Sequence, residues 1–389
     1  MTVHRVPYWR LSLFYFFYFA VLGGFMPYWS LYLDDLRFSA AQIGQLMAVG
    51  MLTRIIAPNF WGWLADSTGR RIELVRFGAV MVSVFWAGIF WVGDAFWLMA
   101  AVLFAYSFFQ NAILAQFEAV TIAHLGSERS RYGNIRLWGS LGFIAAVAGL
   151  GFVFDHLSVR YLPGLLLGCA VVAAAFSLTV PPPPALPGRR SREPFWRTVC
   201  KRPVAGFLAA HFLLQLSHAP YYSFFSLFLE EHGYSRTAIG LLWSLGVLAE
   251  VLAFTRTHWL LQRFSETGLV LACLLLAGLR WLVIGWGVDY PALVWTVQVL
   301  HAFSFAIFHA AAMQLIFREF SVGQQGQGQA VYSALWGLGV AMGSWMAGAV
   351  WLSLGAAWVY TAAAVICGIA AWVLIKTGER PATVGQSAK

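Results

Sequence analysis

The sequence predicts an all-α membrane protein in which twelve transmembrane helices form two pseudo-symmetric six-helix bundles. Of its 389 residues, 60% are hydrophobic and only 11% are Asp, Glu, Lys or Arg, whereas about 25% of a soluble domain is charged. The mean hydropathy is +0.71. Apolar runs of about twenty residues, the length that crosses a ~30 Å hydrocarbon core, recur along the whole chain.

The first apolar run, residues 11–33, contains no charged residue. It is too long for a signal peptide and lacks a small-residue cleavage site, so we expect it to be a retained helix. The other helices follow from the same pattern of apolar runs separated by short polar segments. The expected helices span residues 9–33, 40–64, 73–93, 96–122, 134–154, 159–180, 204–229, 238–259, 267–287, 291–317, 327–352 and 356–376.

The positive charges indicate how the chain is oriented. If both termini are cytoplasmic, most of the 25 Lys and Arg residues fall on the cytoplasmic side, and only Arg37, Arg160 and Arg236 face the other side. This asymmetry matches the positive-inside rule. The net charge of +9 is therefore explained by topology, and nucleic acid is not expected as a partner.

A segment rich in proline and arginine divides the expected helices into six and six. It contains four consecutive prolines, which favour an extended connector. The expected organisation is an N-terminal bundle at residues 1–180, a cytoplasmic linker at 181–203, and a C-terminal bundle with a short cytoplasmic tail at 204–389.

The two halves are related in sequence. A shift of 196 residues aligns Ser39 with Ser235 and Gly44 with Gly240 without a gap. The same shift places Arg54 on Glu250. Parallel repeats of this kind predict a substrate site between the two halves, near the middle of the membrane.

Five charged side chains lie inside the apolar runs. Each costs about 2.5–3.5 kcal/mol at the centre of a bilayer unless it is compensated. We therefore expect these groups to face a polar path through the protein. They are Arg54, Glu118, Arg136, Glu250 and Arg280.

Several classes of chemistry find no support in the sequence. The four cysteines show neither metal-ligand spacing nor a plausible disulfide pairing. There is no zinc motif and no glycine-rich phosphate loop, so we expect no metal, no cofactor and no enzymatic activity. Work against a gradient would have to use an ion gradient or a partner subunit.

The segment Gly62-Trp-Leu-Ala-Asp66-Ser-Thr-Gly69-Arg70-Arg71 follows the second expected helix. It resembles the signature loop of the major facilitator superfamily (MFS). The resemblance implies the MFS fold with alternating access. It also implies that Gly62, Asp66, Gly69, Arg70 and Arg71 form a gating motif that holds the cytoplasmic side closed in the outward-facing state.

Within the superfamily the chain resembles the lactose permease-like branch, and more closely the phenylpropionate permeases. The matching segments are residues 14–19, 27–30 and 132–140, and the resemblance covers nearly the whole chain.

This resemblance implies roles for the charged residues. Glu118 and Arg136 are expected to bind substrate. Glu250, Arg280 and His301 are expected to take part in proton coupling, with His301 also binding substrate.

Three positions depart from lactose permease. Ser304 stands where that protein has a titrating Glu, Ala253 stands where sugar porters have Asn, and Phe143 replaces a Trp that stacks on the sugar ring. An apolar, aromatic-lined site suits an aryl acid better than a disaccharide. The phenylpropionate branch is therefore the better match.

In the first half, Arg136 is the candidate for a substrate carboxylate because a guanidinium can donate two hydrogen bonds to it. Glu118 would position Arg136, bond the substrate or carry a proton. Arg54 could pair with Asp66 or another cytoplasmic-side group.

In the second half, Glu250 is the first candidate for the coupling proton, with Glu118 also considered, unless Glu250 forms a fixed bridge with Arg280 that never titrates. The candidate substrate-binding set combines both halves. It consists of Glu118, Arg136, Phe143, His218, Tyr221 and His301.

The sequence thus favours a monomeric, multi-pass transporter of the bacterial inner membrane, which uses a proton gradient to move an aromatic carboxylic acid such as 3-phenylpropionate. A proton symporter for a sugar or a nucleoside is the alternative within the same class. A non-transporting sensor or scaffold would not need five costly charges. A membrane enzyme lacks a nucleophile–base set.

Overall fold

The structure is a computed structural model that describes residues 6–126, 128–183, 195–321 and 324–377. All regular elements in these ranges are helices. Most of the expected linker and the expected C-terminal tail, residues 184–194 and 378–389, lie outside the described residues.

Six long helices make up the described residues of the first half. Short 3-10 turns adjoin three of them: η1 (Gly88–Trp91) follows α3, η2 (Arg129–Arg131) precedes α5, and η3 (Val159–Tyr161) precedes α6. The long helices are α1 (Tyr8–Asp35), α2 (Ala40–Thr68), α3 (Arg71–Ala87), α4 (Phe96–Leu125), α5 (Tyr132–His156) and α6 (Leu162–Thr179).

The described residues of the second half begin with the short α7 (Phe195–Val199) and then follow the same plan. One helix is followed by the separate α10 (Thr257–Arg263), and another is divided by η4 (Phe303–Ile307), a π-helical segment. The remaining helices are α8 (Arg202–Glu231), α9 (Arg236–Phe254), α11 (Glu266–Gly287), α12 (Pro291–Gln298), α13 (Phe308–Glu319), α14 (Gln325–Leu354) and α15 (Ala356–Thr377).

Eleven helical segments of the described residues are long and apolar enough to cross a membrane. α8 has a comparable length of 30 residues but carries more polar side chains, including His211, Gln215 and His218. These side chains are buried in the protein. α8 is therefore too polar to be counted with the eleven, although it runs through the interior.

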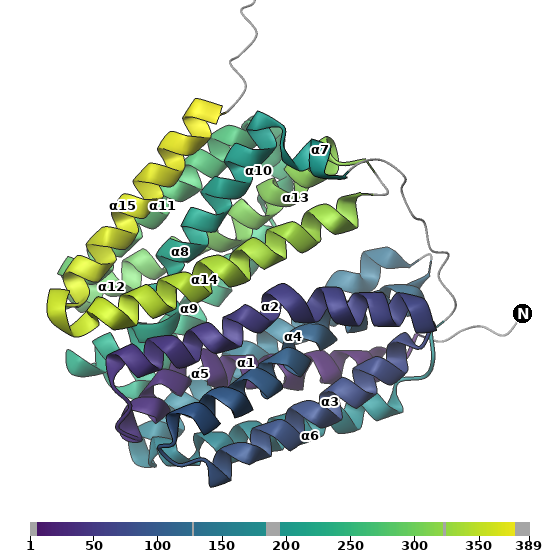
Figure 1. Cartoon of the computed structure of the whole chain (residues 1–389), viewed down its shortest axis with the longest axis horizontal. Helices are drawn as coiled ribbons and strands as arrows, with labels where there is room; N and C mark the ends of the chain where they lie inside the picture. The colour runs from purple at the N-terminus through teal and green to yellow at the C-terminus, as the bar shows by residue number, and fades with distance from the viewer. Residues whose placement is uncertain (1–5, 127, 184–194, 322–323, 378–389) are drawn as a thin grey trace, which may run out of the picture.

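The helices of each half lie together, as Figure 1 shows by the separation of purple and blue ribbons from green and yellow ones. Within the described residues, the halves meet mainly where α2 packs on α14, α5 packs on α9, and α1 packs on α8. α2 and α9 occupy equivalent places in the two repeats, as do α5 and α14. The first two contacts are thus versions of one interface.

Glycines allow this interface to close at one end of the molecule. A Cβ on Gly44 of α2 would lie 2.4 Å from Ser344 O of α14. In the equivalent interface, a Cβ on Gly240 of α9 would lie 2.5 Å from Val147 O of α5. A larger residue at either position would push the two helices apart.

We call this end, which carries residues 36–39 and 232–235, the closed end. From there α2 and α14 diverge toward the end where α2 joins α3 (Figure 1). The two halves are therefore in closest contact on one side of the molecule.

The sequence repeat is also visible in how helices begin. Ser39 is the N-cap of α2, where its side chain accepts a hydrogen bond from Gln42 N, and Ser235 is the N-cap of α9, where it accepts one from Ala238 N. These are the two serines that the shift of 196 residues aligns. A serine at this position satisfies a backbone N–H that the first turn of a helix leaves free.

Three expected helix ranges need correction. α2 continues to Thr68, so the first part of the glycine-containing motif is helical, and the helix ends because Gly69 adopts φ 69°. α9 ends at Phe254 and not at residue 259, because a turn separates it from α10. The expected helix at 291–317 is found as one membrane-spanning segment, Pro291–Glu319, but a turn at residues 299–300 and the π-helical η4 divide it into α12 and α13.

Candidate functional site

The most enclosed polar cluster lies between α9, α11 and the segment that follows α12. His301 Nε2 lies 2.7 Å from Glu250 Oε1, and His301 Nδ1 lies 3.0 Å from Arg280 Nη1. The side chains of His301 and Glu250 are 6% and 11% exposed, and Arg280 is fully buried. The imidazole therefore stands between the carboxylate and the guanidinium.

These contacts fix the protonation of the imidazole. A guanidinium can only donate hydrogen bonds, so Nδ1 of His301 must accept one from Arg280. The ring is then neutral with its proton on Nε2, and this N–H donates to Glu250. A positively charged His301 would direct a second N–H at Arg280. Glu250 and Arg280 are thus connected through the neutral imidazole of His301, which forms a hydrogen bond with each of them.

Arg280 has further side-chain contacts. Its Nη2 donates to Gln298 Oε1 at 2.8 Å, and its guanidinium lies 4.1 Å from the ring centroid of Tyr221 and 4.8 Å from that of Trp281. Tyr221 also donates to Gln298 Oε1 at 3.3 Å. Within the described residues, Arg280 Nε and Gln298 Nε2 are buried without a hydrogen-bond partner. The described part of the cluster therefore contains two nitrogen atoms that could still donate hydrogen bonds.

His218 and Ser304 lie at the margins of this cluster. The rings of His218 and His301 are 6.5 Å apart, and Nδ1 of His218 bonds Leu214 O of its own helix at 2.8 Å. Ser304 donates to His301 O at 3.2 Å, inside the π-helical segment. A π-helical turn adds one residue to the helix and is frequent at functional sites. Here it begins just after His301.

The first half contributes a second charged pair. Glu118 of α4 and Arg136 of α5 approach to 3.7 Å between Oε1 and Nε. Their side chains are 35% and 30% exposed, so this pair is more accessible than the cluster around His301. Arg136 also lies over the rings of Phe19 and Tyr15, at 4.0 and 5.7 Å. A cation, a carboxylate and two aromatic faces thus occur together.

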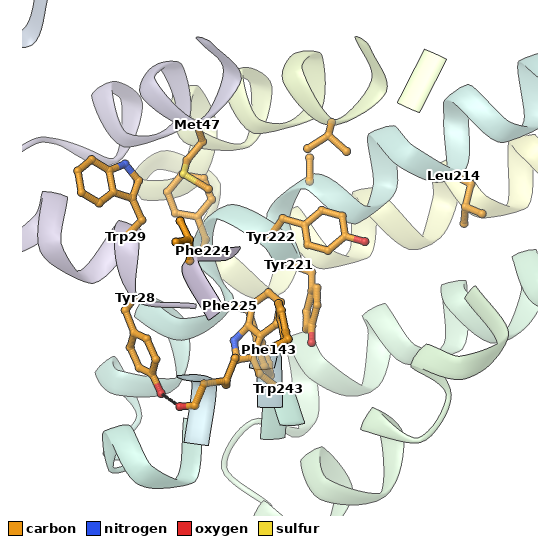
Figure 2. Packing of buried hydrophobic residues seen from close by; sticks show 14 of the residues in the cluster. Tyr28, Trp29, Met47, Phe143, Leu214, Tyr221, Tyr222, Phe224, Phe225 and Trp243 are labelled. Carbon is orange, nitrogen blue, oxygen red and sulfur yellow. Dashed lines mark hydrogen bonds between the residues drawn. The ribbon is translucent and has the colours of Figure 1, made fainter. Parts of the chain in front are cut away.

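Phe143 of α5 is buried where α5 meets α1, and a Cβ on Gly23 of α1 would lie 2.6 Å from Phe143 O. In the second half, Tyr221 packs on Trp243 with centroids 4.6 Å apart and on Phe225 with centroids 4.7 Å apart (Figure 2). These three residues form an aromatic cluster of α8 and α9.

Arg54 lies apart from both charged clusters. Its guanidinium stacks on Trp336 of α14 at 4.8 Å from the ring centroid. The pairing of Arg54 with Asp66 considered above is wrong, because Asp66 instead pairs with Arg71 at 2.5 Å. Arg71 also donates to Gln116 Oε1 at 2.6 Å. The motif residues Asp66 and Arg71 therefore make these contacts within the first half.

At the closed end, a carboxylate joins the halves. Asp155, near the end of α5, accepts hydrogen bonds from the backbone N–H groups of Arg236 and Thr237 at 2.7 and 3.1 Å. Those two groups open α9, where a negative charge is favoured by the helix dipole. The Arg236 side chain donates to Phe154 O at 3.2 Å and to Glu230 at 2.7 Å.

Sequence reasoning missed three of these contributors. In the sequence, Gln298 is one polar residue among several, and nothing distinguishes Trp336 from the other tryptophans, of which the chain has 19 in all. Asp155 lies at the end of an apolar run, where a carboxylate has no distinctive signal. Only packing between helices distant in sequence gives these residues their partners.

Comparison with known proteins identifies the class. The model of the MFS_1 like family matches residues 8–362. The chain is 32% identical to the probable 3-phenylpropionic acid transporter of Escherichia coli (strain K12) over 333 residues, which cover 84% of this chain and 86% of the relative. It is 28% identical to the maltose permease of Geobacillus stearothermophilus over 381 residues, 95% of each.

The fold agrees with these relationships. The crystal structure of the nucleoside transporter NupG superposes with a TM-score of 0.82 at 16% identity, covering 98% of this chain and 100% of that one. The protein is an MFS transporter with multiple membrane-spanning helices. More narrowly, the chain belongs to the MFS_1 like family.

The site brings together groups that can bind charged ligands and groups that can titrate. Glu250 and Glu118 can each hold a proton, and His301 connects one of them to Arg280. Across the described ranges, no group of three or more His, Cys, Asp or Glu residues is placed to hold a metal ion.

Proposed function

We propose that this transporter is a symporter that moves a small aromatic carboxylic acid together with protons across the bacterial inner membrane. In this proposal α8 is the twelfth transmembrane helix, both termini are cytoplasmic and the protein acts as a monomer. The closed end then faces the periplasm, so that the state described here is inward-facing. 3-Phenylpropionate is the preferred substrate.

The arrangement of Glu250, His301 and Arg280 is the observation that carries the proposal. The three groups are buried and connected by hydrogen bonds of 2.7 and 3.0 Å. A proton added to Glu250 removes the negative charge that Arg280 balances through His301. The free energy of that change depends on every neighbouring charge, so an anionic substrate nearby alters proton affinity, and the proton alters substrate affinity by the same factor.

Glu250 also lies where it can respond to the arrangement of the halves. It belongs to α9, which packs on α5, and it lies close enough to Arg136 of α5 for the two charges to interact. When the halves rock, this distance changes. Proton binding at Glu250 and movement of the halves would thereby be coupled.

The aromatic surroundings and one of the relatives support this substrate class. Phe19 and Tyr15 supply ring faces beside Arg136. A relative named as a probable 3-phenylpropionic acid transporter supports the same class. The similarity to a maltose permease, which extends over 95% of both chains, favours a sugar as the second candidate.

Uptake into membrane vesicles tests both candidates. We expect labelled 3-phenylpropionate to accumulate when an inward proton gradient is imposed and not when a protonophore removes it. Maltose and uridine, assayed in the same vesicles, should not accumulate. Gradient-driven uptake of maltose without any uptake of 3-phenylpropionate would replace the aryl acid by a sugar, and uptake that ignores the gradient would contradict proton coupling.

A further inference from the structure

The intramembrane charges do not balance in the described structure. Glu118 is paired with Arg136, and Glu250 is linked to Arg280 through His301. Among the residues that the structure describes, the guanidinium of Arg54 makes neither an ion pair nor a hydrogen bond, although much of the side chain is enclosed. In the described part of the chain, this positive charge is therefore left without a counter-ion.

The surroundings of Arg54 are aromatic and contain hydroxyl groups. Trp336 covers one face of the guanidinium. Tyr18, Tyr222 and Tyr332 are close enough for their hydroxyls to interact with its charge. A ring face that suits an aryl acid thus lies directly against the cation.

The three hydroxyls differ in how far they are already used. Tyr18 donates to Gln110 O at 2.9 Å, and the Tyr332 hydroxyl lies 3.2 Å from Nδ1 of His309. In Figure 2 the hydroxyl of Tyr222 points away from that of the neighbouring tyrosine on α8. Of the three hydroxyls, those of Tyr18 and Tyr332 are therefore already engaged within the protein.

Arg54 also lies at the contact between the halves. A Cβ on Gly337, next to Trp336, would lie 3.0 Å from Arg54 Cβ and 2.9 Å from Met51 O. The cation thus belongs to α2 of the first half, and its aromatic platform belongs to α14 of the second. A molecule bound at Arg54 would be shared by both halves.

We propose that Arg54, with Trp336, is the site that binds the carboxylate of the transported acid. The inference rests on the proposed function and makes its substrate class specific, namely a monocarboxylate that carries an aryl group. A guanidinium donates two parallel hydrogen bonds to a carboxylate. Trp336 would then contact the apolar part of the substrate.

This site is a better anchor for a carboxylate than Arg136, the residue expected from the sequence. Arg136 already faces Glu118 at 3.7 Å, so a second carboxylate there would meet a like charge. At Arg54 an incoming carboxylate neutralises a charge that lacks a counter-ion among the described residues. A neutral sugar would leave that cation uncompensated.

Binding of two matched ligands to the purified full-length protein tests the site. The probes are 3-phenylpropionate and its uncharged analogue 3-phenylpropionamide, measured by isothermal titration calorimetry. In Arg54→Gln we expect 3-phenylpropionate to bind about 10- to 100-fold more weakly, as for the loss of a charge-assisted hydrogen-bonding group. The weak affinity for 3-phenylpropionamide should stay within about twofold of wild type.

Two further variants complete the comparison. Arg256→Gln removes the same charge from an exposed position outside the site and should leave both affinities unchanged. Arg54→Lys keeps the charge but loses the planar fork, so its affinity for 3-phenylpropionate should fall between wild type and Arg54→Gln. If Arg54→Gln does not yield folded protein by its thermal unfolding curve, Arg54→Lys takes its place in the test.

The outcomes separate the site from the proposed function. If wild type and Arg54→Gln bind 3-phenylpropionate equally, the Arg54 site is wrong while the aryl-acid function stands. If wild type binds a different carboxylate in a thermal-shift panel and Arg54→Gln does not, the site stands and the aryl acid is wrong. Stabilisation of wild type by maltose or uridine, but by no carboxylate, overturns both.

Discussion

The carboxylate of Asp155, at the end of α5, accepts a hydrogen bond of 2.7 Å from the backbone N–H of Arg236, the first residue of α9. One half of the molecule thereby caps a helix of the other half. The charge acts on the positive end of the α9 dipole, in addition to satisfying N–H groups that have no partner within the helix. This contact exists only while the closed end is closed.

Asp155→Ala should therefore shift the molecule away from this state. Ser235 remains the N-cap, but loss of a negative charge at a helix N-terminus costs about 1 kcal/mol, which corresponds to roughly a fivefold change in the balance of two states. Electron-spin distance measurements between labels at Leu157 and Asp289, both exposed at the closed end, should show an increased population of long distances.

Asp94 supplies the control for this measurement. It is an exposed carboxylate in the connection between η1 and α4, so Asp94→Ala changes the charge equally without touching α9. An unchanged distance distribution in Asp155→Ala would mean that other contacts hold this end closed.

Gly348→Ala should act on the same equilibrium through packing. The added Cβ would lie 2.6 Å from Ala40 O and 2.9 Å from Gly44 Cα, so α2 and α14 would have to separate. Overpacking of this kind typically costs about 1–3 kcal/mol. We therefore expect a larger population of long distances between the labels at Leu157 and Asp289 than in wild type. Gly368→Ala on α15, where an added Cβ meets nothing within 4 Å, should leave the distances as in wild type. Equal distributions in the two variants would contradict the prediction.

Glu250→Gln should separate transport from proton coupling. The amide oxygen can still accept the hydrogen bond from His301 Nε2, but the side chain can no longer take up a proton. We expect uptake driven by a proton gradient to fall by about tenfold or more, while exchange of labelled for unlabelled 3-phenylpropionate without a gradient continues. Glu128→Gln, in an exposed pair with Arg131, serves as control. Intact coupling in Glu250→Gln would transfer the proton site to Glu118 or His301.

His301→Ala should destabilise the protein more than the loss of a histidine exposed at a helix end does. The change removes the hydrogen bonds of Glu250 Oε1 and Arg280 Nη1 in a buried place. Losing hydrogen bonds to charged groups costs about 1.5–3 kcal/mol each, so a marked fall in the thermal unfolding temperature in detergent is expected. His156→Ala, whose exposed ring bonds Phe152 O of its own helix, should change it little. Similar unfolding temperatures would show that the imidazole does not hold the cluster.

The sequence was sufficient for the parts of this protein that depend on local pattern. Apolar runs predict the helices because a bilayer requires a certain length, and Ser39 and Ser235 mark the starts of α2 and α9 through capping. The order of Glu118 and Arg136 on successive helices, together with the family resemblance, predicts that the two charges lie near one another, and their side chains approach to 3.7 Å.

Partner choice between distant helices was less predictable. A direct bridge between Glu250 and Arg280 is the simplest expectation from their charges, but His301 lies between them, just before the π-helical segment. The orientation of the His301 imidazole depends on the change from α-helix to π-helix that follows it. A single sequence does not predict such a change.

The same limit applies to Arg54. Its guanidinium turns toward Trp336 because α2 packs on α14 at that level, whereas Asp66 lies about three turns further along α2 and pairs with Arg71. Such choices depend on packing angles between helices that lie far apart in the chain.

The polar character of α8 has a consequence for biogenesis. A helix with buried His211, Gln215 and His218 gains little from contact with lipid, so it is poorly retained in a bilayer by its own composition. Its neighbours α14 and α15 are synthesised last. A chain that stops before α14 would therefore leave α8 without the two helices on which its polar side chains pack.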